Sequence, residues 1–371
     1  MSMRRSSLHE LPPPPPGILS EVHSFLRGLG APPYRYQQLV TAFQRGAQSF
    51  QEVRDLPSDL RQQLVSRFGL TVLPLEVETV RTGAQVEKVL FRTRTGARVE
   101  TVLSRYRAGW SSVCVSTQAG CGLACSFCAT GALGLERNLS ADEICAQVVH
   151  RRWSSEPGGA PKSVAFMGMG EALANPNVLT ALSVLTAPGY GGLSPRRITV
   201  STVGLAPALA ALTEAHPQVT LTLSVHSPFP EQRAQLIPLE RRFTLEENLA
   251  ILDRHVLRAR RKTYLAYLLI EGINDSEEHL AALARLVQRR SRPELFHVSV
   301  IRYNAAFGAD PSFRAPESSR VDDFVARLHR LGVNATRRQQ FGADIDAACG
   351  QLRAESLGRL GRRRPSGDPR G

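Results

Sequence analysis

The sequence has little lysine, few cysteines and no long apolar run. Lysine occurs only at positions 88, 162 and 262, so nearly all of the 46 basic residues are arginine. No run of about eighteen apolar residues is present, which excludes a transmembrane helix, and the first residues lack the apolar centre of a signal peptide. The six cysteines, three of them clustered, suit a reducing compartment rather than a framework of structural disulfides. We therefore expect a cytosolic protein whose thiols serve cofactors or catalysis.

Basic residues outnumber acidic ones by a wide margin. The 46 basic and 33 acidic residues give a formal net charge of +13. Arginine side chains neutralise phosphates and release counterions, so nucleic acid is the first candidate partner. A GC-rich genome would explain the preference for arginine over lysine, but not the excess of bases over acids. The charge does not indicate which nucleic acid is bound.

The chain divides into five segments of different composition. Five consecutive prolines and a terminal run of arginines predict a disordered lead over residues 1–17 and a basic disordered tail over residues 353–371. The pattern between them predicts three short helices over 18–71, a β extension with glycine turns over 72–111, and a main domain over 112–352.

Apolar runs and amphipathic helical stretches alternate through the main domain. The runs are VCVST, SVAFMGMG, RITVSTVG, VTLTLSVH, TYLAYLLI and FHVSVIRYN. Ser140 with Glu143, and Thr244 with Glu247, have the spacing of a capping box and predict helix starts. The predicted fold is α/β: a parallel sheet with helices outside, forming a full or partial (β/α)6 barrel of the TIM type.

Glycines and polar side chains are concentrated where the predicted strands end. These segments are Gly168–Glu171, Ser201–Gly204, Ser224–Ser227 and Tyr303–Asn304. Barrel active sites form at the carboxyl ends of strands, so we expect these segments and a nearby cysteine loop to meet at one mouth. Each residue alone is a weak signal, since a single strand-end histidine such as His226 is more often structural.

Three cysteines lie in the run CGLACSFC. Cys121, Cys125 and Cys128 have a Cys-x3-Cys-x2-Cys spacing. A [4Fe-4S] cluster needs a ligand on each of its four irons, so three thiols leave one iron for a small molecule. That vacancy is typical of radical S-adenosylmethionine (SAM) chemistry, in which SAM chelates the remaining iron. The alternative is a zinc site with a distant fourth ligand, although cysteine zinc sites normally use two short pairs and the other three cysteines form none.

The remaining cysteines differ in their surroundings. Cys145 lies inside the helix predicted after Ser140, where an unpaired thiol is usually a small buried hydrophobe. Cys114 lies on the strand that leads into the cysteine loop, and Cys349 lies in DIDAACGQL near the C-terminus. Both can reach the barrel mouth. The glycine after Cys349 and the acids before it suggest a mobile thiol with a function, and a structural thiol stays an equal alternative.

These motifs resemble a known family, the radical SAM RNA adenine methyltransferases (RlmN/Cfr). It comprises housekeeping enzymes that methylate adenine C2 and antibiotic-resistance enzymes that methylate C8. The resemblance runs from about residue 20 to residue 352, and the order and spacing of the motifs agree. The motifs that carry it are CVSTQAGCGLACSFCATG, FMGMGEALAN, LSPRRITVSTVG, LSVHSP and FGADIDAACGQL.

The resemblance implies a mechanism that consumes two SAM molecules. The [4Fe-4S] cluster would be held by Cys121, Cys125 and Cys128, and SAM would be contacted by Gly170, Glu171, Ser201, Ser224, Val225, His226 and Asn304. Cys349 would receive a methyl group from one SAM. The second SAM would yield a 5′-deoxyadenosyl radical, which takes hydrogen from that S-methyl group so that the carbon radical attacks adenine. Glu100 would accept a proton, and a transient disulfide between Cys114 and Cys349 would release the product.

Three segments resemble the C8 branch. Ala172, Ser227-Pro228 and Gln340-Phe341-Gly342 stand where the C2 enzymes favour proline, alanine and Thr-Arg-Gly, whereas Ala305 departs from both branches. We therefore expect methylation at C8 of adenosine 2503 in 23S ribosomal RNA, with resistance to drugs that bind the peptidyl-transferase centre. The alternative is C2 methylation of that adenosine and of adenosine 37 in tRNA.

The resemblance also implies partners. The small helical module and the basic surface would grip 23S ribosomal RNA by its shape and backbone, and a flavodoxin or ferredoxin would donate electrons. We expect a cytoplasmic monomer that does not bind membranes. A hypothesis from a different class is a non-catalytic, zinc-stabilised RNA-binding protein, which would contain zinc instead of iron.

Overall fold

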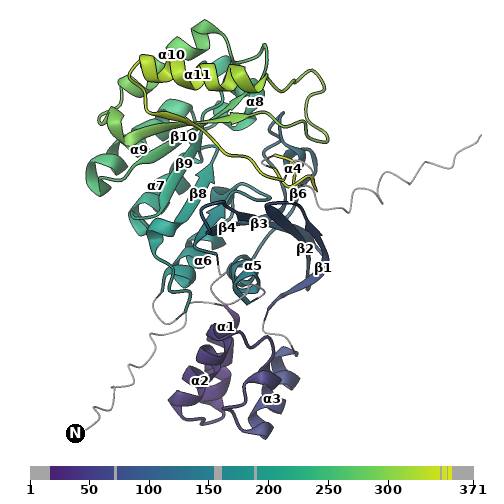
Figure 1. Ribbon diagram of the computed structural model, residues 1–371. Coiled ribbons are helices and arrows are strands. Elements are labelled where there is room, and N and C mark those ends of the chain that lie inside the picture. Colours follow the sequence, from purple (N-terminus) through teal and green to yellow (C-terminus); the bar gives the residue numbers. More distant parts are fainter. Residues whose placement is uncertain are drawn as a thin grey trace, which may run out of the picture.

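The computed structural model describes residues 17–70, 73–153, 161–187, 190–342, 345–348 and 350–352 (Figure 1). Nearly all of the predicted lead, the whole predicted tail, and Cys349 lie outside these described residues. No helix in the described ranges is long and apolar enough to cross a membrane.

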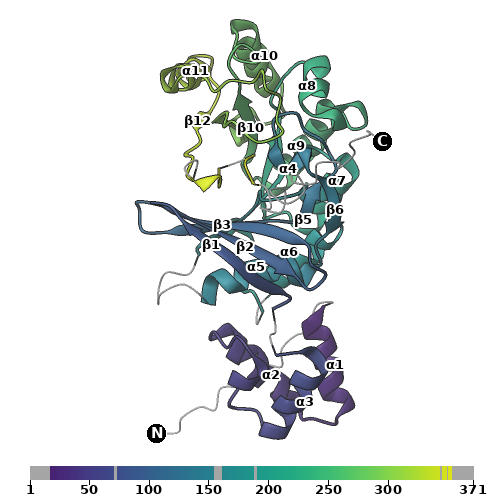
Figure 2. The same cartoon turned by 90° about the vertical axis from the view of Figure 1, so that its right-hand side faces the viewer.

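Three short helices enclose an apolar core of their own. They are α1 (Ile18–Gly28), α2 (Pro33–Gln44) and α3 (Ser58–Phe68), with a 3-10 turn η1 (Phe50–Glu52) between the last two. Val22, Leu39, Phe50 and Leu64 are fully buried between them. Figure 2 shows this module as a separate layer beneath the β1–β3 sheet. The backbone N–H of Ile18 donates to Asp142 Oδ2 at 2.6 Å, so the module is also tied to the main domain.

The strands of the predicted β extension belong to the main sheet. Strands β1 (Leu75–Thr82), β2 (Val86–Thr93) and β3 (Arg98–Arg105) pair antiparallel in sequence order. Strand β3 then pairs antiparallel with β4 (Ser111–Val115), placing Val102 opposite Cys114. Residues on the extension are therefore held in register with the strand that precedes the cysteine loop.

The remaining strands of the ten-stranded sheet are parallel. Their order is β4, β7 (Ser163–Phe166), β8 (Ile198–Thr202), β9 (Thr220–Ser224), β10 (Thr263–Leu269), β11 (Phe296–Arg302) and β12 (Ala335–Arg337). The six predicted apolar runs correspond to β4 and β7 to β11. Since pairing runs in one line from β1 to β12, the described sheet is open and forms a partial barrel.

Most helices alternate with these strands and cover the outer face of the sheet, whereas the short α4 lies in the cysteine loop (Figure 1). The helices are α4 (Ala129–Ala132), α5 (Ala141–Trp153), α6 (Asn177–Thr186), α7 (Ala206–Ala215), α8 (Pro230–Leu236), α9 (Leu245–Ala259), α10 (Glu277–Gln288) and α11 (Ser318–Arg330), with 3-10 turns η2 (Ala172–Ala174), η3 (Pro195–Arg197), η4 (Pro238–Arg241) and η5 (Pro293–Leu295). Both predicted capping boxes are confirmed: Ser140 and Glu143 exchange bonds at the start of α5, and Thr244 and Glu247 do so at the start of α9.

Candidate active site

A cavity lies at the carboxyl ends of the parallel strands. Its volume is about 180 Å³, and it opens to solvent on one side. Residues from the cysteine loop, from the ends of β7 to β11 and from the C-terminal segment line it. Six of the seven predicted SAM contacts are among them, namely Gly170, Glu171, Ser201, Ser224, His226 and Asn304. The seventh, Val225, is fully buried and does not line the cavity.

The two glycines after β7 bring two backbone segments together. A Cβ on Gly168 would lie 2.7 Å from the carbonyl oxygen of Val115, and one on Gly170 would lie 2.5 Å from Cβ of Gln118. Gly170 also has a φ of +94°, which side-chain-bearing residues rarely adopt. These glycines therefore admit the protein's own β4–β5 backbone, besides the ligand approach expected from the sequence.

Glu171 is buried with its carboxylate aimed at backbone donors. Oε1 accepts from the N–H of Leu173 and Oε2 from the N–H of Val203, both at 2.9 Å. Burial raises the pKa of Glu171, and these two backbone donors oppose the rise. The carboxylate, which also accepts from the Thr202 side chain, thus fixes the end of β8 beside the cavity.

His226 has a defined tautomer. Its backbone is left-handed, with a φ of 58°. Its Nδ1 accepts from the N–H of Leu268 at 3.0 Å, so the remaining ring proton is carried by Nε2. Burial, together with the positive charge of Arg233, lowers the pKa of His226 to about 3. The ring is therefore a neutral donor at the cavity wall. It makes an edge-to-face contact with the Phe127 ring, and the two ring centroids are 4.9 Å apart.

The three clustered cysteines share one loop. Cys121 ends strand β5 (Gln118–Cys121), which pairs with β6 (Gly134–Asn138), and Cys128 precedes α4 and lines the cavity. All three are partly buried. Burial raises the pKa of Cys121 to about 11 and that of Cys125 well above its usual range, and the charge of Cys128 adds to both. Neighbouring thiolates are therefore costly unless a cation neutralises them.

This donor set fits an iron–sulfur cluster. Within the described ranges, no three cysteine, histidine or carboxylate side chains are arranged to hold a single metal ion. A [4Fe-4S] cluster instead takes one thiolate per iron, and the loop offers three. Cys128 places the loop at the cavity that carries the predicted SAM contacts.

Glu100 and Cys114 lie on strands behind the cavity and are not among its lining residues. Glu100, on β3, is fully buried and forms an ion pair with Lys88 on β2 at 3.4 Å. Lys88 Nζ also donates to the carbonyl of Asp346 at 3.1 Å, three residues before Cys349 in the chain. Cys114 is partly buried on β4.

The C-terminal segment contacts the end of the cysteine loop through residues 350–352. The backbone N–H of Ala129 donates to the carbonyl of Gly350 at 2.9 Å, and Thr130 Oγ1 donates to the carbonyl of Leu352 at 2.6 Å. Gly350 and Leu352 also line the cavity. The residue that follows Cys349 is therefore part of the cavity wall.

Three basic residues were not predicted as part of the site. Arg338 lines the cavity just after β12, a strand too short to recognise in the sequence. Arg233 is fully buried beneath the strand ends, although an arginine in a helix usually indicates a solvated face. Lys88 could have been singled out in the sequence, because it is one of only three lysines in an arginine-rich chain.

Comparison with known proteins agrees with this geometry. Residues 115–284 match the Radical SAM superfamily. The ribosomal RNA large subunit methyltransferase Cfr of Shouchella clausii is 43% identical over 329 residues, covering 88% of this chain and 93% of that protein. The Cfr of Staphylococcus aureus is 42% identical over 334 residues, covering 90% and 95%. The crystal structure of a radical SAM methyltransferase from Sphaerobacter thermophilus superposes with a TM-score of 0.85 at 38% identity, covering 91% of this chain and 98% of that one.

Proposed function

This chain belongs to the radical SAM family of ribosomal RNA large subunit methyltransferases named Cfr, and from that premise we propose that it methylates C8 of adenosine 2503 in 23S ribosomal RNA. The modification would confer resistance to drugs that bind the peptidyl-transferase centre. The observation that carries the proposal is one cavity that joins the strand-end polar residues, Cys128, and Gly350 next to Cys349.

Cys121, Cys125 and Cys128 would each bind one iron of a single [4Fe-4S] cluster, with the fourth iron left to SAM. When bound, the cluster and two SAM molecules per turnover supply the methyl group, an electron and a 5′-deoxyadenosyl radical. Such chemistry is needed because C8 of adenine is an electron-poor amidine carbon that cannot attack a sulfonium methyl directly. The protein's part is to bind, orient and shield the reactants.

The cavity wall offers groups suited to each part of SAM. The carboxylate of Glu171 can accept from the amino group, and the neutral His226 ring can donate from Nε2 to an acceptor. Ser201 and Ser224, on adjacent strands β8 and β9, would bind the carboxylate or the ribose hydroxyls. The wall thus presents both donors and acceptors to a zwitterionic ligand.

Two thiols and one carboxylate would act on the methyl group and the RNA. Cys349 would carry the methyl group, and Glu100 would accept the proton that leaves the adenine ring, with Lys88 stabilising the carboxylate. Cys114 would then form a disulfide with Cys349, because the covalent link between RNA and Cys349 must be cut for release. This ordering assigns a separate role to each residue.

A polyanionic substrate agrees with the net charge of +13. Ribosomal RNA as substrate would place the enzyme in the cytoplasm. A flavodoxin or ferredoxin would supply the electron. We expect the enzyme to act as a monomer, because one chain contains all the proposed site residues.

Position-specific isotope labelling tests the regiochemistry. Reconstituted enzyme and SAM would be incubated with ribosomal RNA fragments deuterated at C8 or at C2 of the target adenosine. We expect the methylated product to lose the C8 label and keep the C2 label, because the segments around Ala172, Ser227 and Gln340 resemble the C8 branch. Retention of the C8 label with loss of the C2 label would overturn the proposal in favour of C2 methylation.

A further inference from the structure

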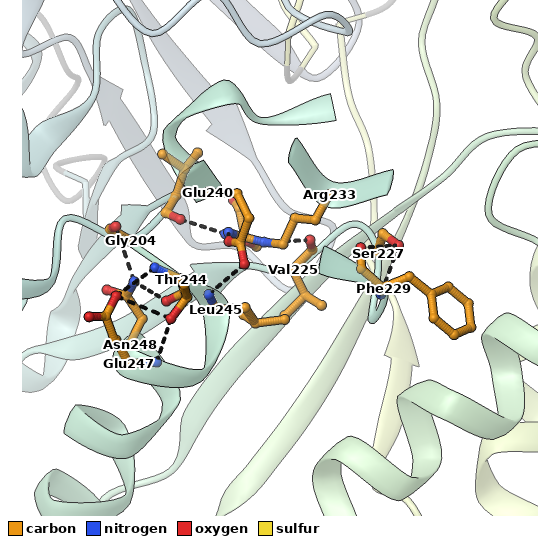
Figure 3. Close-up of polar contacts among 12 residues, drawn as sticks. Gly204, Val225, Ser227, Phe229, Arg233, Glu240, Thr244, Leu245, Glu247 and Asn248 are labelled. Atoms are coloured by element: carbon orange, nitrogen blue, oxygen red, sulfur yellow. Dashed lines mark hydrogen bonds and ion pairs between the residues drawn. The ribbon is translucent and has the colours of Figure 1, made fainter. Parts of the chain in front are cut away.

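Arg233 lies on α8 with a fully buried side chain that donates to two strand ends (Figure 3). Its Nε donates to the carbonyl of Val225 at 3.1 Å, and its Nη2 donates to the carbonyls of Val203 and Ser224 at 2.6 and 2.8 Å. Val203 follows β8. Ser224 is the last residue of β9, and Val225 follows it. One guanidinium therefore holds together the carboxyl ends of two strands that line the cavity.

Glu240 balances this buried charge and extends the network to α9. One of its oxygens accepts from Arg233 Nη1, and the other accepts from the N–H of Leu245 at 3.0 Å. Glu240 is 5% exposed, so this ion pair is withdrawn from water. Burial lowers the pKa of Arg233, while Glu240 opposes the change. Since each donor and acceptor in the network has a partner, the desolvated charges are compensated.

The same helix contacts the cysteine loop. The carbonyl of Leu236, at the end of α8, accepts from the N–H of Ser126 at 3.1 Å. Leu236 and Ile237 are buried in an apolar cluster against which Cys125 and Phe127 pack.

We propose that Arg233 is a positioning residue that fixes the carboxyl ends of β8 and β9 against the cysteine loop. The fork geometry of the guanidinium is essential, because it reaches three carbonyls and a carboxylate from one side chain. This inference rests on the proposed SAM and cluster binding, but not on which adenine carbon is methylated.

The test compares Arg233→Gln, Arg233→Lys and a matched control, Arg290→Gln, by SAM binding in the absence of RNA. Arg290 is also a buried ion-pair residue, 7% exposed, but it joins Glu246 and Asp253 on α9 and does not line the cavity. Each reconstituted holoenzyme would be assayed anoxically for SAM affinity by equilibrium dialysis, iron content after desalting, and thermal unfolding. The electron paramagnetic resonance spectrum of the reduced cluster would be recorded with and without SAM.

We expect both Arg233 variants to weaken SAM binding by about 10–100-fold, the change that corresponds to the loss of one hydrogen bond from a charged donor. Arg233→Gln should also retain less iron, whereas Arg233→Lys, which keeps the charge, should retain more iron than Arg233→Gln. Arg290→Gln should lower only the unfolding temperature.

Wild-type SAM affinity in the Arg233 variants, with a thermal loss like that of Arg290→Gln, would overturn the inference. If Arg233→Gln fails to fold, Arg233→Lys makes the same comparison. A wild-type protein that binds neither iron nor SAM would instead refute the proposed function, whereas methylation at C2 would leave the role of Arg233 intact.

Discussion

At the scale of single residues, Lys88 joins the antiparallel extension to the segment before Cys349. Its ammonium contacts both Glu100 and the Asp346 carbonyl, and only 4% of the side chain is exposed. We expect Lys88→Met to lower the free energy of unfolding by about 3 kcal/mol, because it leaves the buried Glu100 carboxylate without this countercharge. Urea unfolding would measure the change, with Lys162→Met, at an exposed lysine, as the control. Equal unfolding midpoints for the two variants would contradict this role.

Acid sensitivity is predicted at His150. Burial lowers the pKa of His150 to about 4, with the charge of Arg151 adding to the effect, from the 6.5 of an exposed histidine. Between these values the unfolded chain binds more protons, so the free energy of unfolding falls as the pH drops through this window. We expect His150→Phe, which would keep the edge-on contact with Phe91, to lose less stability than wild type between about pH 7.5 and about pH 5.

The measurement is the urea midpoint at each pH. His226, whose pKa is lowered to about 3, should leave part of the dependence in place. An unchanged difference between the two pH values in His150→Phe would show that His150 is protonated equally in both states.

The two thiols with proposed roles in turnover, Cys114 and Cys349, should give opposite failures. We expect Cys349→Ala to abolish turnover, because no thiol remains to carry the methyl group. Cys114→Ala should instead leave RNA covalently attached to protein, since the link through Cys349 would not be cut. Denaturing gels of labelled RNA after reaction would separate these results. Free methylated RNA in normal yield from Cys114→Ala would remove the resolving role.

Cys145→Ser, at a buried thiol inside α5, should cause only a modest loss of stability.

At the scale of elements, the start of α9 is secured by a complete capping box. Thr244 Oγ1 accepts from the N–H of Glu247, and the Glu247 carboxylate accepts from the N–H of Thr244. We expect Thr244→Ala to cost about 1 kcal/mol of stability, measured by thermal or urea unfolding. The next residue, Leu245, donates to Glu240, so the loss should be accompanied by weaker SAM binding if this network positions the strand ends. An unchanged unfolding midpoint would contradict the capping contribution.

The parallel strands were predictable, because each carries a short run rich in apolar and β-branched residues. The capping boxes were predictable from their spacing. Strand β12 was not, since it has only three residues and two are exposed. The β5–β6 ribbon also escaped prediction, because the glycines and cysteines of that loop follow neither a helical nor a strand period.

The predicted convergence of strand-end residues is confirmed by the cavity, whereas their contacts with SAM stay a prediction. Topology explains this success, because parallel strands bring their carboxyl ends to one edge. Arg233 and Arg338 could not be found in this way. Their places depend on tertiary contacts, such as the bonds from Arg233 to Val203 and Val225, which no local pattern encodes.

At the scale of the whole molecule, the β extension and the C-terminal segment are built into the main domain. Strand β3 pairs with β4. Leu352 accepts a hydrogen bond from Thr130, which lies 222 residues earlier in the chain. The pairing of β3 with β4 was not predicted, because pairing partners are not visible in one sequence. The arrangement places Glu100, Cys114 and the residues around Cys349 on connected elements.

The central claim is that three cysteines hold an iron–sulfur cluster with one iron free to cleave SAM. The direct test is to reconstitute the protein anoxically, reduce it with dithionite in the presence of SAM, and quantify iron, sulfide and 5′-deoxyadenosine. We expect a coloured protein that releases 5′-deoxyadenosine, and loss of both properties in Cys125→Ala. A colourless protein that contains zinc and releases no 5′-deoxyadenosine would contradict the account.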